Sequence, residues 1–151
     1  MGTHLVYRMV LALALLLPAA GCTSYVTTPR GFAELDSSSY DYRATTADGV
    51  VIAVRELDND PEGDLEFWAG VIDAKMRQRY TAETVDEIQT RAGMDGVQVR
   101  YVTTRNGRTH RYWTTVFVDE DEVYLIEAAG DAELFDAHVE DVERTIASFE
   151  I

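Results

Sequence analysis

The sequence has 151 residues, a formal net charge of −14 and a single cysteine. Nucleic-acid binding depends on basic patches, so this charge argues against that class of function. It also argues against electrostatic adhesion to anionic lipids. A single cysteine rules out a disulfide within one chain, so the stability of the folded protein has to come from packing alone.

The first 21 residues are typical of a secretory signal peptide. One cation, Arg8, precedes an apolar run over residues 9–17, and small residues lie immediately before Cys22. The run ends at Pro18 and is shorter than the roughly 18 to 20 apolar residues that a membrane-spanning helix needs. We therefore expect residues 1–21 to be removed from the mature protein.

Residues 19–22, Ala-Ala-Gly-Cys, resemble the lipobox of bacterial lipoproteins, in which signal peptidase II cleaves before a lipidated cysteine. Ala20 and Gly21 match the motif, whereas Ala19 stands where leucine is commonest. The resemblance implies a diacylglycerol thioether on Cys22 and often a third, amide-linked chain, and two or more acyl chains anchor a protein stably to a membrane. The alternative is an ordinary secretory peptide followed by a free cysteine.

The same resemblance implies a location in the bacterial cell envelope. Thr23, rather than an aspartate, follows the cysteine, so the sorting rule of lipoproteins predicts the outer membrane, facing the periplasm, if the envelope is Gram-negative. Residues 22–31 lack periodicity and are typical of a flexible tether. Residues 32–151 are then expected to form a single domain.

The predicted strands form a hairpin and a meander. The hairpin pairs residues 40–45 with residues 50–55 around Asp48-Gly49. A further strand is expected over 84–91, and the meander has three strands, over 97–104, 108–118 and 123–129, with Asn106-Gly107 as its strongest turn signal. Bulky side chains occupy both faces of the strand over 108–118, so we expect that strand to be central.

Two helices are predicted, one after the hairpin and one at the C-terminal end. Asp60-Pro61 has the chemistry of an N-cap followed by a first helical residue, and the apolar spacing over 65–76 predicts a helix as far as Tyr80. Asp131 is the expected N-cap of one final helix, whose apolar face covers residues 135–149. The element order is therefore ββα-ββββ-α, an α+β fold in which two main helices flank an antiparallel sheet.

This order, with a final helix ending in Ala147-Ser148-Phe149, resembles the PsbP/DcrB-like fold over about residues 32–151. The resemblance implies an α/β/α sandwich. The family includes extrinsic photosystem subunits and bacterial envelope lipoproteins, mostly without enzymatic activity. No functional residue of the family maps onto this sequence, so the resemblance implies a scaffold or binding role only by analogy.

The acidic segments and histidines offer weak metal-site signals. Residues 58–64 begin like a calcium loop, but Ala69 stands where the bidentate glutamate should be, so helix capping is the preferred interpretation. Residues 119–122 are typical of a solvated turn. His110 and His138 are not at a ligand spacing, and no serine lies in a nucleophile motif. We predict no catalytic residue, no metal and no cofactor.

The candidate binding surface is a set of aromatic and arginine side chains on neighbouring predicted strands. Its members are Arg100, Tyr101, Arg111, Tyr112, Trp113 and Tyr124. Such a set suits a groove for a peptide or a glycan. The alternative is that these aromatic residues belong to the core or form cross-strand pairs.

Three functions are compatible with these features. The preferred hypothesis is a lipid-anchored envelope protein that binds a protein partner or supports a complex without catalysis, which a filled core and an exposed patch on one face would favour. The second is a periplasmic module that binds a small apolar or aromatic ligand between sheet and helix, in a concave pocket with convergent polar groups. The third is a hydrolase, for which two perturbed carboxylates would face each other in a cleft.

Overall fold

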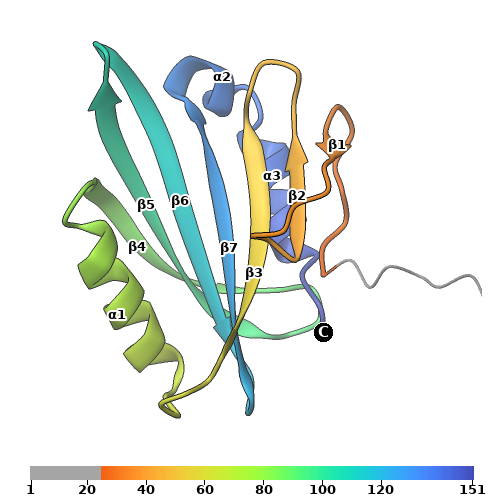
Figure 1. The fold of residues 1–151 in the computed structure, drawn as a ribbon, viewed down its shortest axis with the longest axis vertical. Coiled ribbons are helices and arrows are strands. Elements are labelled where there is room, and N and C mark those ends of the chain that lie inside the picture. The colour runs from red at the N-terminus through yellow and green to blue at the C-terminus, as the bar shows by residue number, and fades with distance from the viewer. Residues whose placement is uncertain (1–24) are drawn as a thin grey trace, which may run out of the picture.

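A computed structural model describes residues 25–151, so the predicted signal peptide and Cys22 lie outside the described residues. All neighbouring strands are antiparallel, and seven strands form one sheet in the order β1-β2-β3-β7-β6-β5-β4. The strands are β1 (Ala33–Glu34), β2 (Tyr42–Thr45), β3 (Val51–Asp58), β4 (Thr81–Gln89), β5 (Asp95–Arg105), β6 (Arg108–Val118) and β7 (Glu122–Asp131). The helices are α1 (Leu65–Met76), α2 (Ala132–Asp136) and α3 (Val139–Ala147). Helix α1 covers one face of the sheet, and α2 and α3 lie on the opposite side (Figure 1). The predicted α+β architecture is confirmed.

The predicted turns have the backbone geometry that their residues favour. Gly49 in the β2–β3 turn has φ 94°, and Asn106 and Gly107 in the β5–β6 turn have φ 51° and 74°. The β5–β6 turn has positive φ at both of its central residues, as a type I′ turn requires, and this turn type matches the twist of a hairpin. The strand predicted over 108–118 is internal and corresponds to β6. Strand β1 was not predicted, because two residues are too short to show a period.

Helix α1 begins later than predicted. Its N-cap is Asp64, whose side chain accepts a hydrogen bond from the Phe67 amide at 2.8 Å. The Asn59 side chain accepts hydrogen bonds from the Gly63 amide at 2.9 Å and from Trp68 Nε1 at 2.7 Å. The prediction of a helix from Pro61 to Tyr80 is wrong at its start, because Asn59 holds the residues before Asp64 in a loop, and the helix also ends earlier, at Met76.

The C-terminal segment forms two helices instead of the single predicted helix. Asp131 caps α2 as expected, accepting a hydrogen bond from the Glu133 amide at 3.3 Å. At His138 the backbone leaves the helical region, with φ −113° and ψ 8°. The His138 side chain lies between Asp48 and Asp141, at 3.6 Å and 3.7 Å, and these contacts hold the chain at the break.

The part of the predicted tether that the structure describes, residues 25–31, is packed against the domain instead of forming a flexible linker. The Tyr25 ring packs against Tyr124 and Phe149, with centroid distances of 5.6 Å and 6.3 Å, and Val26 is buried in the core. The Glu150 amide donates a hydrogen bond to the Tyr25 carbonyl at 3.1 Å. The predicted boundary is wrong because these apolar side chains complete the core, and the folded domain includes Tyr25.

The two faces of the sheet are packed unequally. On the side of α2 and α3, a large cluster fills the space between sheet and helices, and within it Phe117 stacks on Phe149 at 4.7 Å. On the side of α1 the buried cluster is small. Its members are Ile72, Val116, Val123 and Leu125. The thinly covered α1 side therefore has room for polar groups and hollows between the helix and the sheet.

Candidate functional site

The structure does not bring the six residues of the predicted binding surface together. Tyr101 and Tyr112 face the α1 side: the Tyr101 hydroxyl donates to Asp73 of α1 at 2.8 Å, and Tyr112 is its cross-strand partner. The other four side chains are Arg100, Arg111, Trp113 and Tyr124, and they face α2 and α3. Neighbouring residues of a strand point to opposite faces, so a set that contains consecutive residues has to be divided.

Three of the six are core residues. The exposed fractions of Tyr101, Trp113 and Tyr124 are 0%, 4% and 3%. Arg100 lies over the Trp113 ring, with its guanidinium carbon 4.1 Å from the ring centroid, and forms an ion pair with Glu143 at 3.0 Å. Trp113, Tyr124 and Arg100 attach the sheet to the C-terminal segment, whereas Tyr101 attaches it to α1. These three aromatic residues are therefore core residues, which is the alternative interpretation of the set.

Arg111 joins three elements of the fold. Its guanidinium forms ion pairs with Asp136 of α2 and with Glu83 of β4, both at 3.0 Å. The hydrogen bond to Asp136 is the main reason that the pKa of Arg111 is raised. With both carboxylates in place, Arg111 holds the edge strand β4 and helix α2 to β6.

A group of polar side chains lies on the α1 side, and Tyr112 is the one member that belongs to the predicted binding surface. Its centre is Glu127 of β7, which is only 8% exposed. Arg55 Nε donates to Glu127 Oε2 at 2.9 Å, and the Tyr112 hydroxyl donates to Glu127 Oε1. Arg55 Nη2 also donates to the Tyr40 hydroxyl at 3.0 Å, and the Tyr80 ring stacks on Tyr112 at 4.7 Å. These five residues are called the Glu127 cluster.

The sequence contains one signal for this cluster. Val123, Leu125, Glu127 and Ala129 share one face of the strand predicted over 123–129, so the pattern places a lone carboxylate among apolar residues on that face. A carboxylate of this kind is rarely buried unless it is paired. Its partner could not be read from the sequence, because Arg55 lies 72 residues away.

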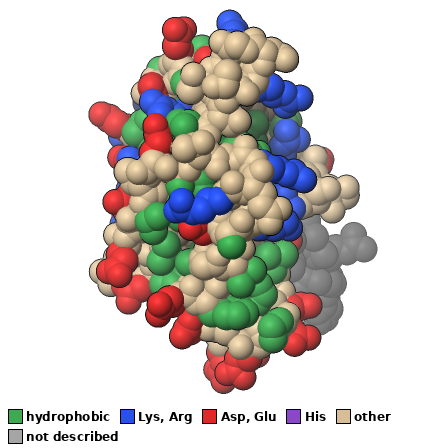
Figure 2. Space-filling view, turned by 90° about the vertical axis from the view of Figure 1, so that its left-hand side faces the viewer, with side chains coloured by type: hydrophobic (Ala, Val, Ile, Leu, Met, Phe, Trp, Pro, Cys, Tyr) green, Lys and Arg blue, Asp and Glu red, His purple; other side chains and the backbone are tan. Residues whose placement is uncertain are grey.

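Helix α1 divides its side of the sheet into two hollows. The Glu127 cluster borders a pocket of about 470 Å³ between α1, β3 and β7, which Lys75 and Arg79 also line. On the other side of the helix, α1 and strands β4 and β5 enclose a groove of about 920 Å³. Figure 2 looks at this side of the molecule: Lys and Arg side chains gather in its upper half, whereas Asp, Glu and hydrophobic side chains dominate its lower end.

The tyrosines of this side act as hydrogen-bond donors. Burial and then the charge of Glu127 raise the pKa of Tyr112, and burial and then the hydrogen bond to Asp73 raise the pKa of Tyr101. Both phenols therefore stay protonated near neutral pH. Both oxygens of Glu127 already accept hydrogen bonds, so this carboxylate is not a free nucleophile. A ligand would meet the hydrogen-bond donors and the positive charge of the cluster instead.

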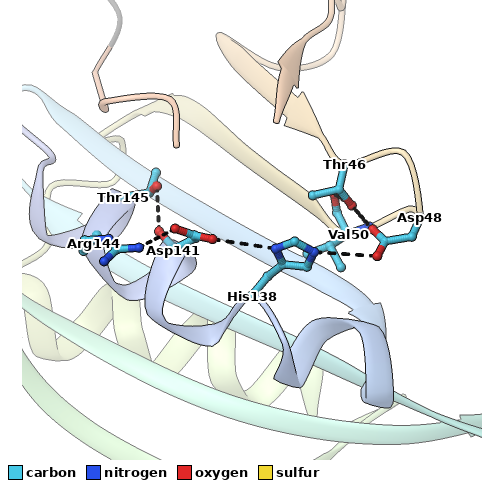
Figure 3. A network of polar contacts seen from close by, with 7 residues as sticks. All are labelled: Thr46, Asp48, Val50, His138, Asp141, Arg144 and Thr145. Atoms are coloured by element: carbon cyan, nitrogen blue, oxygen red, sulfur yellow. Dashed lines mark hydrogen bonds and ion pairs between the residues drawn. The ribbon is translucent and has the colours of Figure 1, made fainter. Parts of the chain in front are cut away.

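The contacts of His138 form a second polar network on the opposite side of the sheet (Figure 3). A histidine beside a carboxylate supplies two of the three members of a catalytic triad, and the third is a nucleophile within reach of the histidine. The two nearby hydroxyls point elsewhere: Thr46 donates to Asp48, and Thr145 donates to the Asp141 carbonyl at 2.9 Å. The bond from Thr46 is also the main reason that the pKa of Asp48 is lowered. The network ties the β2–β3 turn to α3.

Within residues 25–151, no group of three or more His, Cys, Asp or Glu side chains is placed to hold a metal ion. The acidic turn over residues 119–122 is closed by a hydrogen bond from the Asp119 amide to the Glu122 carbonyl at 2.8 Å. The Asn59 side chain donates to the Asp119 and Glu120 carbonyls, each at 3.3 Å. None of the helices in the described part of the chain has the length and apolar character needed to cross a membrane.

No protein family model and no curated protein sequence matches this chain. Solved structures with a similar fold do exist. LpqN from Mycobacterium tuberculosis, described as involved in cell envelope biogenesis, has a TM-score of 0.63 at 12% identity, over 80% of this chain and 78% of LpqN. PA94 from Pseudomonas aeruginosa, described as a protein of unknown function and putative regulator, has a TM-score of 0.57 at 11% identity, over 89% of this chain and 88% of PA94.

The cyanobacterial PsbP protein CyanoP from Synechocystis sp. PCC 6803 is similar as well. Its TM-score is 0.53 at 12% identity, over 82% of this chain and 83% of CyanoP. Identities this low establish a shared fold and do not transfer function. The chain therefore has the PsbP-like fold that its order of elements predicts.

Proposed function

We propose that this chain is a lipid-anchored protein of the bacterial cell envelope, whose domain binds another protein without catalysis. The observation that carries the proposal is an exposed apolar patch on the α1 side, opposite a filled core. Phe67 and Val71 are each 45% exposed, and Leu57 is 40% exposed. These three residues are called the α1 patch.

The members of the α1 patch are neighbours. Phe67 and Val71 lie one helical turn apart on α1, and Val71 and Leu57 border the same pocket. Hydrophobic side chains are visible together in the lower part of Figure 2, with acidic side chains around them. Contiguous apolar surface with a polar rim is typical of protein interaction sites.

The envelope location and the lipid on Cys22 are proposed from the leader. The run Ala-Ala-Gly-Cys over residues 19–22 supports cleavage and lipidation, and Thr23 supports the outer membrane, facing the periplasm, if the organism is Gram-negative. The description of LpqN as a protein of cell envelope biogenesis supports the same compartment. The strongly acidic composition leaves the acyl chains as the means of membrane attachment.

The absence of catalysis is proposed from the chemistry of the two polar networks. In the Glu127 cluster the carboxylate is held by two donors, and in the His138 network the nearby hydroxyls do not point at the histidine. General-base catalysis requires a base within hydrogen-bond reach of the proton it removes, and nucleophilic catalysis requires an activated nucleophile. Neither arrangement is assembled in these two networks.

The test compares partner capture by three forms of the lipidated protein, solubilised gently from their native membrane. These are the wild type, the double variant Phe67→Asp Val71→Asp, and the control Leu35→Asp. Leu35 is similarly exposed, at 41%, but follows β1 at the other edge of the sheet. We expect one stoichiometric protein to be captured by the wild type and the control and lost from the double variant. Equal capture by all three, or no partner at all, would contradict the proposal.

A second candidate function is the binding of a small ligand in the pocket beside the Glu127 cluster. The pocket of about 470 Å³ has converging polar groups and lies within the usual size range of ligand sites. Native mass spectrometry of the purified domain tests this function. A bound small molecule that is lost on Glu127→Gln would favour it, and a ligand-free mass would exclude a tightly held ligand.

A further inference from the structure

The groove between α1 and strands β4 and β5 combines an apolar floor with an acidic rim. Its apolar lining comes from both elements and consists of Leu65, Ala69, Val85, Ile88, Val97 and Val99. Five carboxylates complete the lining, from Asp64, Glu66, Asp73, Glu87 and Asp95. None of the described residues that border the groove is a cation. A ligand that fits this groove therefore has to carry positive charge and apolar surface together.

Two of these carboxylates are available to a partner. Asp64, Asp73 and Asp95 already accept hydrogen bonds from within the chain, from Phe67, Tyr101 and Gln89 respectively. Glu66 and Glu87 are exposed and stand on opposite banks of the groove, on α1 and on β4. A basic side chain lying in the groove would have a carboxylate on either side.

Two small residues in the middle of the helical bank leave space in the groove. Ala69 and Gly70 lie side by side on α1 and both line the groove. A Cβ atom added at Gly70 would meet nothing within 4 Å. Glycine in the middle of a helix lowers helix stability, so a larger residue here would stabilise α1 and narrow the groove at the same time.

Strand β4 forms the other bank and is the last strand of the sheet. It pairs with β5 on one side, and Val85 in its middle is 58% exposed. An edge strand presents unpaired backbone groups that can pair with an added strand.

A second copy of this chain is a poor occupant, since β4 itself carries Glu83, Asp86 and Glu87 and the chain has a net charge of −14. Like charges placed across two paired strands repel each other.

We propose that the groove binds an extended basic segment of a partner protein, which pairs with β4 as an additional strand and directs every second side chain, a lysine or arginine, into the groove. The long stems of these side chains pack on Val85 and Val97, while their charged ends reach Glu66 and Glu87. The inference rests on the proposed function, because it names the chemistry of the partner segment that the domain binds.

The experiment measures the binding of short fluorescent peptides to the soluble domain, residues 25–151, by anisotropy at low ionic strength. The first probe has four Lys-Thr repeats, whose alternation puts all lysines on one face of a strand. The second has four Lys-Pro repeats, with equal charge, but proline removes every second amide donor and favours the polyproline II conformation over a β-strand. The third has four Glu-Thr repeats. We expect the first to bind at least about tenfold more tightly than the second, and the third not to bind.

Two matched pairs of variants locate the site. Glu87→Lys and Asp86→Lys change the charge equally on adjacent residues of β4, but only Glu87 lines the groove, since Asp86 pairs with Gln98, whose side chain lies on the other face. Gly70→Ala leaves the groove open, and Gly70→Leu narrows it. We expect Glu87→Lys and Gly70→Leu each to weaken the Lys-Thr probe by about tenfold or more, and each control by less than about threefold. Thermal melting checks that all four variants are folded.

Equal affinity for the Lys-Thr and Lys-Pro probes, or equal losses from Glu87→Lys and Asp86→Lys, would overturn the proposal, because attraction to the overall negative charge would then explain the binding. Failure of the proposed function is a separate result. A partner that is captured from the membrane through the α1 patch, and is retained by Gly70→Leu and Glu87→Lys, would leave the proposed function standing while this inference fails.

Discussion

Tyr112 and Trp113 are adjacent in β6 and serve opposite sides of the sheet. The Tyr112 hydroxyl donates to the buried Glu127 carboxylate on the α1 side. The Trp113 ring packs edge-on against Phe135 of α2, with a centroid distance of 5.0 Å. One strand therefore contributes to the polar cluster of one face and to the apolar core of the other, and replacing each residue probes a different layer.

Trp113→Ala is expected to be strongly destabilising. The side chain is buried and also supports the Arg100 guanidinium, so its removal leaves a cavity and should lower the free energy of unfolding by about 3–5 kcal/mol. Urea denaturation followed by circular dichroism measures the loss. Phe67→Ala is the control, because Phe67 is exposed and its replacement should cost less than about 1 kcal/mol. Equal stability of the two variants would show that Trp113 is not a core residue.

Tyr112→Phe tests the Glu127 cluster with the loss of a single oxygen atom. The variant leaves one oxygen of a buried carboxylate without its donor, so the free energy of unfolding should fall by about 1–3 kcal/mol. Tyr124→Phe is the matched control, since the Tyr124 hydroxyl donates to Glu122, which is less buried than Glu127 and can be solvated instead. A smaller effect at Tyr112 than at Tyr124 would contradict the role given to the cluster.

The strands were predictable where local signals decide them. The alternation over residues 108–118 and the dipeptide Asn106-Gly107 located β6 and its turn, because side-chain period and positive φ are properties of neighbouring residues. The starts of the helices were less predictable. Asp60 and Asp64 are both good N-caps, and the contacts of Asn59 with Gly63 and Trp68 select the second.

The features that depend on distant contacts could not be predicted from the sequence. Tyr25 and Val26 look like part of a linker until the C-terminal Phe149 and Glu150 are placed beside them. The candidate surface of arginine and aromatic residues contains consecutive residues of β6, whose side chains point alternately to the two faces of the sheet. The structure therefore divides that surface between the two faces, although the alternation along this strand was itself predicted. Glu127 was visible as an isolated carboxylate, but only the fold supplies Arg55.

The packing of Tyr25 predicts a dependence of stability on alkaline pH. The hydrogen bond to Glu56, with burial second, raises the pKa of Tyr25 from 10.0 to about 12 in the folded protein. An acid whose pKa is raised by folding stabilises the protein fully below its unfolded pKa, and this contribution is lost as the pH rises through the folded value. The free energy of unfolding should therefore fall between pH 10 and pH 12.

Tyr25→Phe isolates this contribution. The variant removes the titrating group, so its stability should fall less steeply across the same pH range than that of the wild type, as measured by urea midpoints at a series of alkaline pH values. The other tyrosines with raised pKa values are present in both proteins and cancel in the comparison. Identical pH dependence of the two proteins would show that Tyr25 titrates normally and is not held against the domain.

The position of Tyr25 also predicts how close the domain lies to the bilayer. Only Thr23 and Ser24 separate Cys22 from Tyr25. Three extended residue steps span at most about 11 Å, so a lipid on Cys22 would keep the domain at the membrane surface. Energy transfer from the two tryptophans to a labelled lipid should be efficient, and a twelve-residue Gly-Ser insertion after Ser24 should reduce it. Unchanged transfer would mean that the domain is not held there by its N-terminal end.

Cys22→Ser tests the anchor itself. The residue lies before the part of the chain that forms the core, so the variant should keep the melting temperature of the wild-type domain while losing its acyl chains. One or no acyl chain binds a membrane only marginally, and the strongly acidic surface adds no attraction to anionic lipids. We expect the variant in the aqueous phase of a detergent partition and the wild type in the detergent phase, with intact mass showing cleavage before Cys22 only in the wild type. Recovery of both proteins in the detergent phase would contradict lipid anchoring at Cys22 and would require another route to the membrane.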